Sequence, residues 1–153
     1  MVEQEQKIIT TNRKARHDYE IIDSLEVGIV LAGTEVKAIR EGKVNLKDSY
    51  ARIRDGELWL IGTHISPYSK SDSESHDPLQ DRKLLVNRKE LKKLNRQIEE
   101  KGVTLIPLKM YFKRHLIKLE LGLARGKRKY DKRAAIAERD MKRDMERQNK
   151  GTY

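Results

Sequence analysis

The amino-acid sequence predicts a small, mainly β domain followed by a basic C-terminal tail, and three observations lead to this prediction. Apolar and polar residues alternate through residues 19–31, as they do in a strand with one buried face. Two further pairs of such segments are separated by short turns, as in β-hairpins. Residues 125–153 have few large apolar side chains and carry 11 Lys and Arg against 5 Asp and Glu. We therefore expect a folded domain at 1–124 and a tail at 125–153.

Alternating patterns define the predicted strands, which are 19–31, 49–54, 57–61, 103–112 and 117–123. The first is unusually long, so we expect it to bend near Asp23 and Ser24 or at Gly28. Between the second and third strands, Asp55 and Gly56 are a dipeptide that favours a two-residue hairpin turn. We expect these five segments to form a sheet with one apolar face.

Two helices are predicted between the strands. The first spans about residues 33–42, with Val36 and Ile39 on its apolar face. The second spans 87–102, where Asn87 can cap the helix and Glu90 can complete a capping box. Its apolar stripe consists of Leu91, Leu94 and Ile98. Five or six strands with two or three short helices predict a closed barrel of the OB type. Periodicity alone also allows an open α+β sheet.

The tail has helix propensity without a broad apolar face. Glu and Lys stand four residues apart at Glu138 and Lys142, and Arg139, Arg143 and Arg147 follow one helical stripe. Little apolar surface is available to dock such a helix on the domain. We therefore expect the tail to be disordered in the free protein and to become helical against an electronegative surface.

Composition restricts the classes of function. The 153 residues include 34 Lys and Arg against 24 Asp and Glu, a net charge of +10, which favours a polyanionic partner such as nucleic acid. The absence of cysteine excludes disulfides, zinc-thiolate sites and a cysteine nucleophile. We expect no membrane-spanning helix, since no apolar run is long enough, and no secretion signal in the polar residues 1–7. A cytoplasmic protein is the expectation.

No catalytic, metal or cofactor motif is recognisable. Glycine-rich phosphate loops and the Gly-x-Ser-x-Gly pattern are absent, and the histidines His17, His64, His76 and His115 do not occur at ligand spacing. We therefore expect no metal, no cofactor and no enzymatic activity. One alternative is an RNA-processing enzyme with His17 as base and His64 as acid. Another is a barrel-type ribosomal protein or translation factor.

Basic segments are the candidates for RNA contact. Residues 12–17 place Asn12, three cations and His17 immediately before the long strand, and these groups suit phosphate contact and base stacking. Lys37 and Arg40 point away from the apolar face of the first helix. Residues 125–133 form the sharpest basic cluster, with a glycine as pivot and one aromatic ring. A nonspecific basic surface is the alternative for each segment.

Several strings in order make the sequence similar to one known family. They are Asn-Arg-Lys-Ala-Arg-His-Asp-Tyr (12–19), Gly-Thr-Glu-Val-Lys (33–37), Asp-Ser-Tyr-Ala (48–51), His-Ile-Ser-Pro-Tyr (64–68), Asp-Pro (77–78), Arg-Lys-Leu-Leu (82–85) and Gly-Lys-Arg-Lys-Tyr-Asp-Lys-Arg (126–133). Together they resemble the small protein B (SmpB) family, the tmRNA-binding proteins of bacterial trans-translation. The resemblance runs from about Lys7 to Arg139.

The resemblance implies an OB-fold barrel with added helices and a C-terminal tail that is disordered when free. It implies a non-enzymatic adaptor that binds the tRNA-like domain of tmRNA. With elongation factor Tu and GTP, the adaptor would deliver alanine-charged tmRNA to stalled ribosomes. The barrel would take the place of an anticodon arm, and the tail would enter the decoding centre and the empty mRNA channel. The nascent peptide is then tagged for degradation and the ribosome is released. We expect the protein to act as a monomer.

The resemblance also assigns residues. Asn12, Arg13, His17, Glu26 and Leu85 match positions associated with tmRNA binding, and charge alone adds Lys37 and Arg40. Glu26 would order the RNA-facing surface or accept a hydrogen bond from the RNA, with a purely structural role as the alternative. The expected ribosome-binding residues of the tail are Gly126 and Lys127 in a linker, then Tyr130, Asp131, Lys132 and Arg133. Some family members have histidine where this chain has Tyr130, so ring stacking is retained and a titratable nitrogen is lost.

Overall fold

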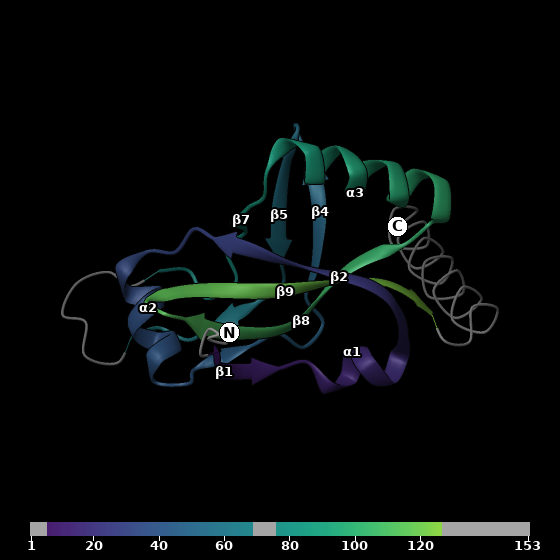
Figure 1. Cartoon of the computed structure of the whole chain (residues 1–153). Helices are drawn as coiled ribbons and strands as arrows, with labels where there is room; N and C mark the ends of the chain where they lie inside the picture. Colours follow the sequence, from purple (N-terminus) through teal and green to yellow (C-terminus); the bar gives the residue numbers. More distant parts are fainter. Residues whose placement is uncertain (1–5, 69–75, 127–153) are drawn as a thin grey trace, which may run out of the picture.

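Antiparallel strands curve into a closed barrel in the computed structural model, which describes residues 6–68 and 76–126 (Figure 1). The elements in chain order are β1 (Gln6–Thr11), α1 (Arg13–Asp18), β2 (Tyr19–Ile29), α2 (Gly33–Arg40), β3 (Val44–Asn45), β4 (Tyr50–Arg54), β5 (Glu57–Ile61), β6 (His64–Ile65), β7 (Arg82–Leu85), α3 (Arg88–Lys101), β8 (Thr104–Lys113) and β9 (Leu116–Gly126). None of the helices in these two ranges has the length and apolarity needed to cross a membrane.

One strand pairing closes the barrel. The large sheet has the order β1-β8-β4-β5-β7-β2-β9, and β8 pairs with β9 as well as with β4. Six strands therefore form a ring, while β1 is an additional strand on β8 and β3 pairs with β6 separately. The predicted mainly β barrel with short helices is confirmed. The open α+β sheet is excluded because β8 joins the two ends of the sheet.

The longer predicted elements form as expected. The β4–β5 turn has positive φ at Asp55 (53°) and Gly56 (72°), as the hairpin dipeptide predicts. Asn87 caps α3 by accepting a hydrogen bond from the backbone N–H of Glu90 at 2.8 Å. Strand β2 has a register shift between Ile21 and Asp23, close to the expected bend. The sequence does not predict β1, α1, β3, β6 or β7, because these short elements, unlike β4 and β5, have no hairpin dipeptide beside them to support a weak periodicity.

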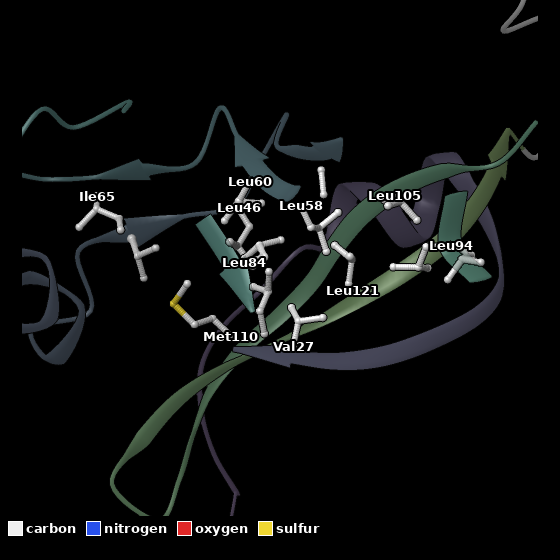
Figure 2. Packing of buried hydrophobic residues seen from close by; sticks show 14 of the residues in the cluster. Val27, Leu46, Leu58, Leu60, Ile65, Leu84, Leu94, Leu105, Met110 and Leu121 are labelled. Carbon is white, nitrogen blue, oxygen red and sulfur yellow. The ribbon is translucent and has the colours of Figure 1, made fainter. Parts of the chain in front are cut away.

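Apolar side chains from the strands and from α3 fill the barrel. Figure 2 shows the packing of Val27, Leu58, Leu84, Leu105 and Leu121, each at most 2% exposed. Leu94 of α3 belongs to the same cluster and is 2% exposed, so this helix covers part of the core. Buried Leu119 and Leu121 of β9 alternate with the outward-facing Lys118 and Glu120, whereas Ala124 further along the outer face is buried because it packs with Ala15 of α1.

A second, smaller cluster holds α1 on the outside of the barrel. Ala15 packs with Ile106, Leu108 and Ala124, all buried. Leu108 lies at a register shift between Pro107 and Lys109, where the strand contains one extra residue. Gly122 provides the space, since a Cβ atom there would come within 2.8 Å of Leu108 Cδ1. The bulge and the glycine together make the docking site for α1.

A buried ion pair connects α2 to β7. The predicted apolar face of this helix is only partly right: Ile39 is buried, Val36 is half-buried, and Glu35 is 1% exposed. Glu35 pairs with the equally buried Arg82, whose Nη1 donates to the carbonyl oxygen of Thr63 at 2.6 Å. Periodicity could not predict this pair, because its members stand 47 positions apart.

Candidate nucleic-acid interface

Asn12 lies in the interior and anchors α1. Its side chain is used inside the fold: Oδ1 accepts from the N–H of Ala15 at 3.2 Å, and Nδ2 donates to the carbonyl oxygens of Leu46 (3.2 Å) and Pro107 (2.9 Å). The residue is 5% exposed. The amide is therefore not presented to a ligand, in contrast to the phosphate contact expected from the sequence. Asn12 acts on the interface by fixing the helix that carries the neighbouring cations.

The polar face of α1 points away from the barrel. Arg13 and His17 are one helical turn apart and both are exposed, with the side chain of His17 88% accessible. Lys14 pairs with Asp48 at 2.9 Å, and Arg16 lies 3.6 Å from Glu120 on β9. The helix therefore presents Arg13 and His17 outward, while Lys14 and Arg16 also tie it to the barrel.

Glu26 is held as an ionised acceptor on the outer face of β2. The hydroxyl of Tyr111 donates to its Oε2 at 2.5 Å, and Lys113 Nζ donates to its Oε1 at 3.1 Å. Burial alone would raise the pKa of Glu26, but these hydrogen bonds and the charges of Lys113 and Lys118 outweigh it, so the pKa lies below its usual value. Burial and the Glu26 carboxylate raise the pKa of Tyr111, which stays protonated as a donor.

Leu85 lies on the same outer face as Glu26. Strand register pairs Leu85 of β7 with Gly28 of β2, and Gly28 with Lys118 of β9. Gly28 leaves the space that Leu85 occupies, since a Cβ atom there would lie 3.2 Å from Leu85 Cβ. Leu85 is 51% exposed. Glu26 and Leu85 are 59 positions apart in the sequence, and the register of β7 on β2 places them on the same face, since Leu85 is opposite Gly28.

Ion pairs join α1 to this face and make the surface continuous. Glu120 is opposite Glu26 on β9, and it contacts both Arg16 (3.6 Å) and Lys109 (3.5 Å). We call this continuous surface the α1–β9 surface. It consists of Arg13, Arg16, His17, Glu26, Leu85, Lys109, Tyr111, Lys113, Lys118 and Glu120. Its cations suit phosphates, its carboxylates can accept from ribose hydroxyls, and Leu85 and the His17 ring suit base faces.

Lys37 and Arg40 are exposed on α2, apart from α1 in the view of Figure 1. Lys37 Nζ lies 5.4 Å from the centroid of the Tyr68 ring. Among residues 6–68 and 76–126, no ion pair or hydrogen bond joins either cation to the α1–β9 surface. The structure therefore does not bring these two residues together with the other predicted contacts.

The last described residues differ from the expected linker. Strand β9 continues past the predicted boundary at residue 124, with Arg125 opposite Glu20 and Gly126 opposite Tyr19. Gly126 is thus the end of a barrel strand. The predicted ribosome-binding residues Lys127, Tyr130, Asp131, Lys132 and Arg133 lie outside the described residues.

Sequence reasoning missed several members of the α1–β9 surface. Lys118 and Glu120 could have been predicted from the sequence, because they alternate with leucines in the last predicted strand. Arg16, Lys109 and Lys113 carry no local signal that separates them from other surface cations. Their role depends on the docking of α1 and on the pairing of β8 with β9.

Comparisons with known proteins agree on one family. The family model described as "SmpB protein" matches residues 9–151. A relative named "SsrA-binding protein" from Desulfitobacterium hafniense is 58% identical over 141 residues, which cover 92% of this chain and 90% of that protein. A relative of the same name from Acetivibrio thermocellus is 52% identical over 153 residues, which cover 100% of this chain and 99% of that protein. A solved structure described as "tmRNA-SmpB: a journey to the center of the bacterial ribosome" is 50% identical, covers 83% of this chain and 93% of that one, and superposes with a TM-score of 0.65.

Proposed function

This chain belongs to the SmpB family, and from that premise we propose that it is an RNA-binding adaptor of trans-translation. It binds the tRNA-like domain of tmRNA, the RNA also called SsrA, and acts on the bacterial ribosome. The names of its relatives and of the solved structure support this function. On the molecule, the supporting observation is that Arg13, His17, Glu26 and Leu85 lie on one continuous outer face.

We further propose the steps that the family resemblance implies. The protein, as a cytoplasmic monomer, delivers alanine-charged tmRNA with elongation factor Tu and GTP to stalled ribosomes. Its basic tail enters the decoding centre and the vacant mRNA channel and becomes helical there. Translation then resumes on tmRNA, which tags the nascent peptide and releases the ribosome.

The geometry favours a non-enzymatic role over RNA cleavage. A general base needs a fixed orientation relative to its substrate and to an acid. The side chain of His17 is 88% accessible, and among the described residues its ring pairs only with Asp18, at 3.2 Å. His64 lies on β6 opposite Asn45 of β3, and among the described residues no hydrogen bond or ion pair joins it to His17. An RNA incubated with the protein alone is expected to stay intact, and a His17→Ala variant is expected to differ in binding only.

A binding competition tests the proposed function. Purified protein is titrated into the labelled tRNA-like domain of tmRNA at moderate salt, against an unlabelled RNA of equal length and unrelated structure. We expect clear preference for the tRNA-like domain. Sequencing the RNA that co-purifies from a bacterial lysate provides the second readout, with tmRNA as the expected main species. Equal affinity for both RNAs would show that the protein is a general RNA binder.

A further inference from the structure

Tyr111 is the member of the α1–β9 surface that is almost fully buried. The residue is only 2% exposed, and Lys109 Nζ lies over its ring, 5.4 Å from the ring centroid. Its hydroxyl donates to Glu26 Oε2 at 2.5 Å, although the two residues stand 85 positions apart. The most direct way for Tyr111 to influence a bound RNA is therefore through the carboxylate that it holds.

The donors around Glu26 fill one of its oxygens and leave the other partly free. A carboxylate offers about four lone-pair positions, two on each oxygen. Oε2 accepts from Tyr111 and, at 3.3 Å, from Lys113 Nζ. Among the described residues, Oε1 accepts only from Lys113 Nζ, at 3.1 Å. Because the side chain of Glu26 is 32% exposed, the second lone pair of Oε1 is open to a donor from outside.

Tyr111 is the partner that fixes the direction of this lone pair. A hydroxyl donating to an ionised carboxylate makes a short, strong hydrogen bond. Lys113 holds Glu26 less firmly, since its ammonium group sits on a flexible four-carbon stem and can follow a rotating carboxylate. The buried ring of Tyr111 has no such freedom. An acceptor fixed in this way binds a donor without the entropic cost of first ordering a long side chain.

The charge of Glu26 indicates which kind of RNA group it accepts. An ionised carboxylate only accepts hydrogen bonds and repels a phosphate, which also only accepts. Glu120 stands opposite Glu26 on β9, so a second carboxylate adds to this repulsion. The centre of the α1–β9 surface therefore suits a neutral donor. In RNA such donors are the ribose 2′-hydroxyl and the amino groups on base edges.

We propose that Tyr111 is a positioning residue of the RNA interface, whose hydroxyl orients Glu26 so that Oε1 accepts a hydrogen bond from a 2′-hydroxyl or a base amino group. This inference rests on the proposed RNA-adaptor function. In the alternative, Glu26 and Tyr111 only stabilise the sheet and no RNA group contacts the carboxylate. The two cases differ in whether the effects of the two residues on RNA affinity are coupled.

A double-mutant cycle measures this coupling. Affinity for the tRNA-like domain of tmRNA is measured at one salt concentration for the full-length unaltered protein, Tyr111→Phe, Glu26→Ala and the double variant. Phenylalanine keeps the ring and removes only the hydroxyl. We expect Tyr111→Phe to weaken binding about tenfold by itself and to have no effect once residue 26 is alanine. An equal loss in both backgrounds, or no loss in either, overturns the inference.

Tyr50→Phe is the matched control for the cycle. Tyr50 is 40% exposed on β4 and lies outside the α1–β9 surface, so the loss of its hydroxyl should leave RNA affinity unchanged. A loss as large as that of Tyr111→Phe would overturn the inference. Circular dichroism establishes that all the variants are folded. The preference of the unaltered protein for the tRNA-like domain over an unrelated RNA does not depend on these variants, and it tests the proposed function separately.

A second measurement follows the Glu26 carboxyl in the free protein. Burial raises the pKa of Glu26, and the hydrogen bond from Tyr111 lowers it together with Lys113 and Lys118. The facing carboxylate of Glu120 is the same in every variant of the cycle. A pH titration followed by NMR of the side-chain carboxyl carbon should therefore show a higher pKa of Glu26 in Tyr111→Phe and no change in the control. An unchanged pKa in Tyr111→Phe would overturn the inference.

Interference mapping separates the two possible donors. Two pools of the tRNA-like domain carry random substitutions, one with 2′-deoxynucleotides and one with base analogues that lack an exocyclic amino group. Each pool is partitioned by the unaltered protein and by Glu26→Ala. A 2′-deoxy position that hinders binding to the unaltered protein only assigns a ribose hydroxyl to Glu26, and a base-analogue position with this behaviour assigns an amino group. The absence of such positions from both pools would overturn the inference.

Discussion

Among single side chains, Asn12 and Arg13 are adjacent in the sequence and have opposite roles. Asn12 is 5% exposed and uses both polar atoms of its amide within the fold, whereas Arg13 is exposed on the first turn of α1. The first residue orients the helix, and the second is available for a phosphate. Substitutions at the two positions should therefore differ in what they change.

Asn12→Ala should lower both stability and RNA affinity. The variant loses the N-cap of α1 and leaves the carbonyl oxygens of Leu46 and Pro107 without this donor, at a cost of about 1–3 kcal/mol. Urea denaturation measures the free energy of unfolding, and a filter-binding titration with the tRNA-like domain measures affinity. A variant as stable as the unaltered protein but unable to bind would mean that the Asn12 amide contacts RNA directly.

Arg13→Ala should weaken binding of the tRNA-like domain and leave stability unchanged. The side chain is exposed, and we propose that it contacts one phosphate, so the slope of log affinity against log salt should become shallower by about 0.7–0.9 units. Titrations at four salt concentrations give this slope. An unchanged slope would remove Arg13 from the interface.

At the level of helices and strands, buried polar contacts decide how the elements are placed. The Glu35–Arg82 pair joins α2 to β7, and each member is 1% exposed on its side chain. Burial would raise the pKa of Glu35, but hydrogen bonds from the Ala32 N–H, Arg82 and Gln80, together with the charge of Arg82, hold the pKa below its usual value of 4.5. Because the folded-state pKa is the lower one, the ionised carboxylate stabilises the fold above pH 4.5. This contribution is lost as the pH falls through the folded-state pKa.

Glu35→Gln should reduce the free energy of unfolding by about 3–5 kcal/mol at pH 7, because it leaves the Arg82 charge buried without its partner. The difference from the unaltered protein should begin to shrink as the pH falls below 4.5, where the carboxylate of the unfolded state takes up a proton, and should vanish as the pH falls through the lower folded-state pKa. Urea denaturation at pH 7, 5 and 4 measures both effects.

Glu57→Gln is the matched control for Glu35→Gln. Its ion pair with Lys83 is 3.0 Å long, but the side chain of Glu57 is 45% exposed. Exposed pairs contribute about 0–1 kcal/mol. If both variants lose the same small amount of stability, the Glu35–Arg82 pair does not hold α2 in place.

At the scale of the entire chain, we expect the barrel and the tail to have different functions that a truncation can separate. Gly126 still pairs with Tyr19 at the end of β9, so a truncation that preserves the barrel removes only residues 127–153. The α1–β9 surface stays complete in this variant. The removed segment includes the predicted ribosome-binding residues Lys127, Tyr130, Asp131, Lys132 and Arg133.

Truncation after Gly126 should leave affinity for the tRNA-like domain largely intact and abolish peptide tagging on stalled ribosomes. A reconstituted translation assay with a message that lacks a stop codon measures tagging, and a binding titration at moderate salt measures affinity. Circular dichroism of the truncated protein provides the folding control. Tagging by the truncated protein would show that the assigned role of the tail is wrong.

Local patterns in the sequence were sufficient for the elements that are long and regular. Strand β2, the β4–β5 hairpin, α3 with its Asn87 cap and the β8–β9 hairpin all follow from period, turn dipeptides and capping residues within a few positions of each other. Basic charge indicated a polyanionic partner, and ordered motifs indicated the family. These signals can be recognised in the sequence alone because each depends on residues that are close together along the chain.

Only the tertiary structure decided which residues share a face. Strand register placed Glu26 opposite Glu120 and Leu85 opposite Gly28, and a bulge at Leu108 docked α1 on β8 and β9. The tertiary structure also places Asn12 in the interior, whereas the sequence led us to expect it at the surface. These outcomes depend on contacts between positions tens of residues apart. A one-residue change of register would send each side chain to the opposite face, so no local pattern can determine them.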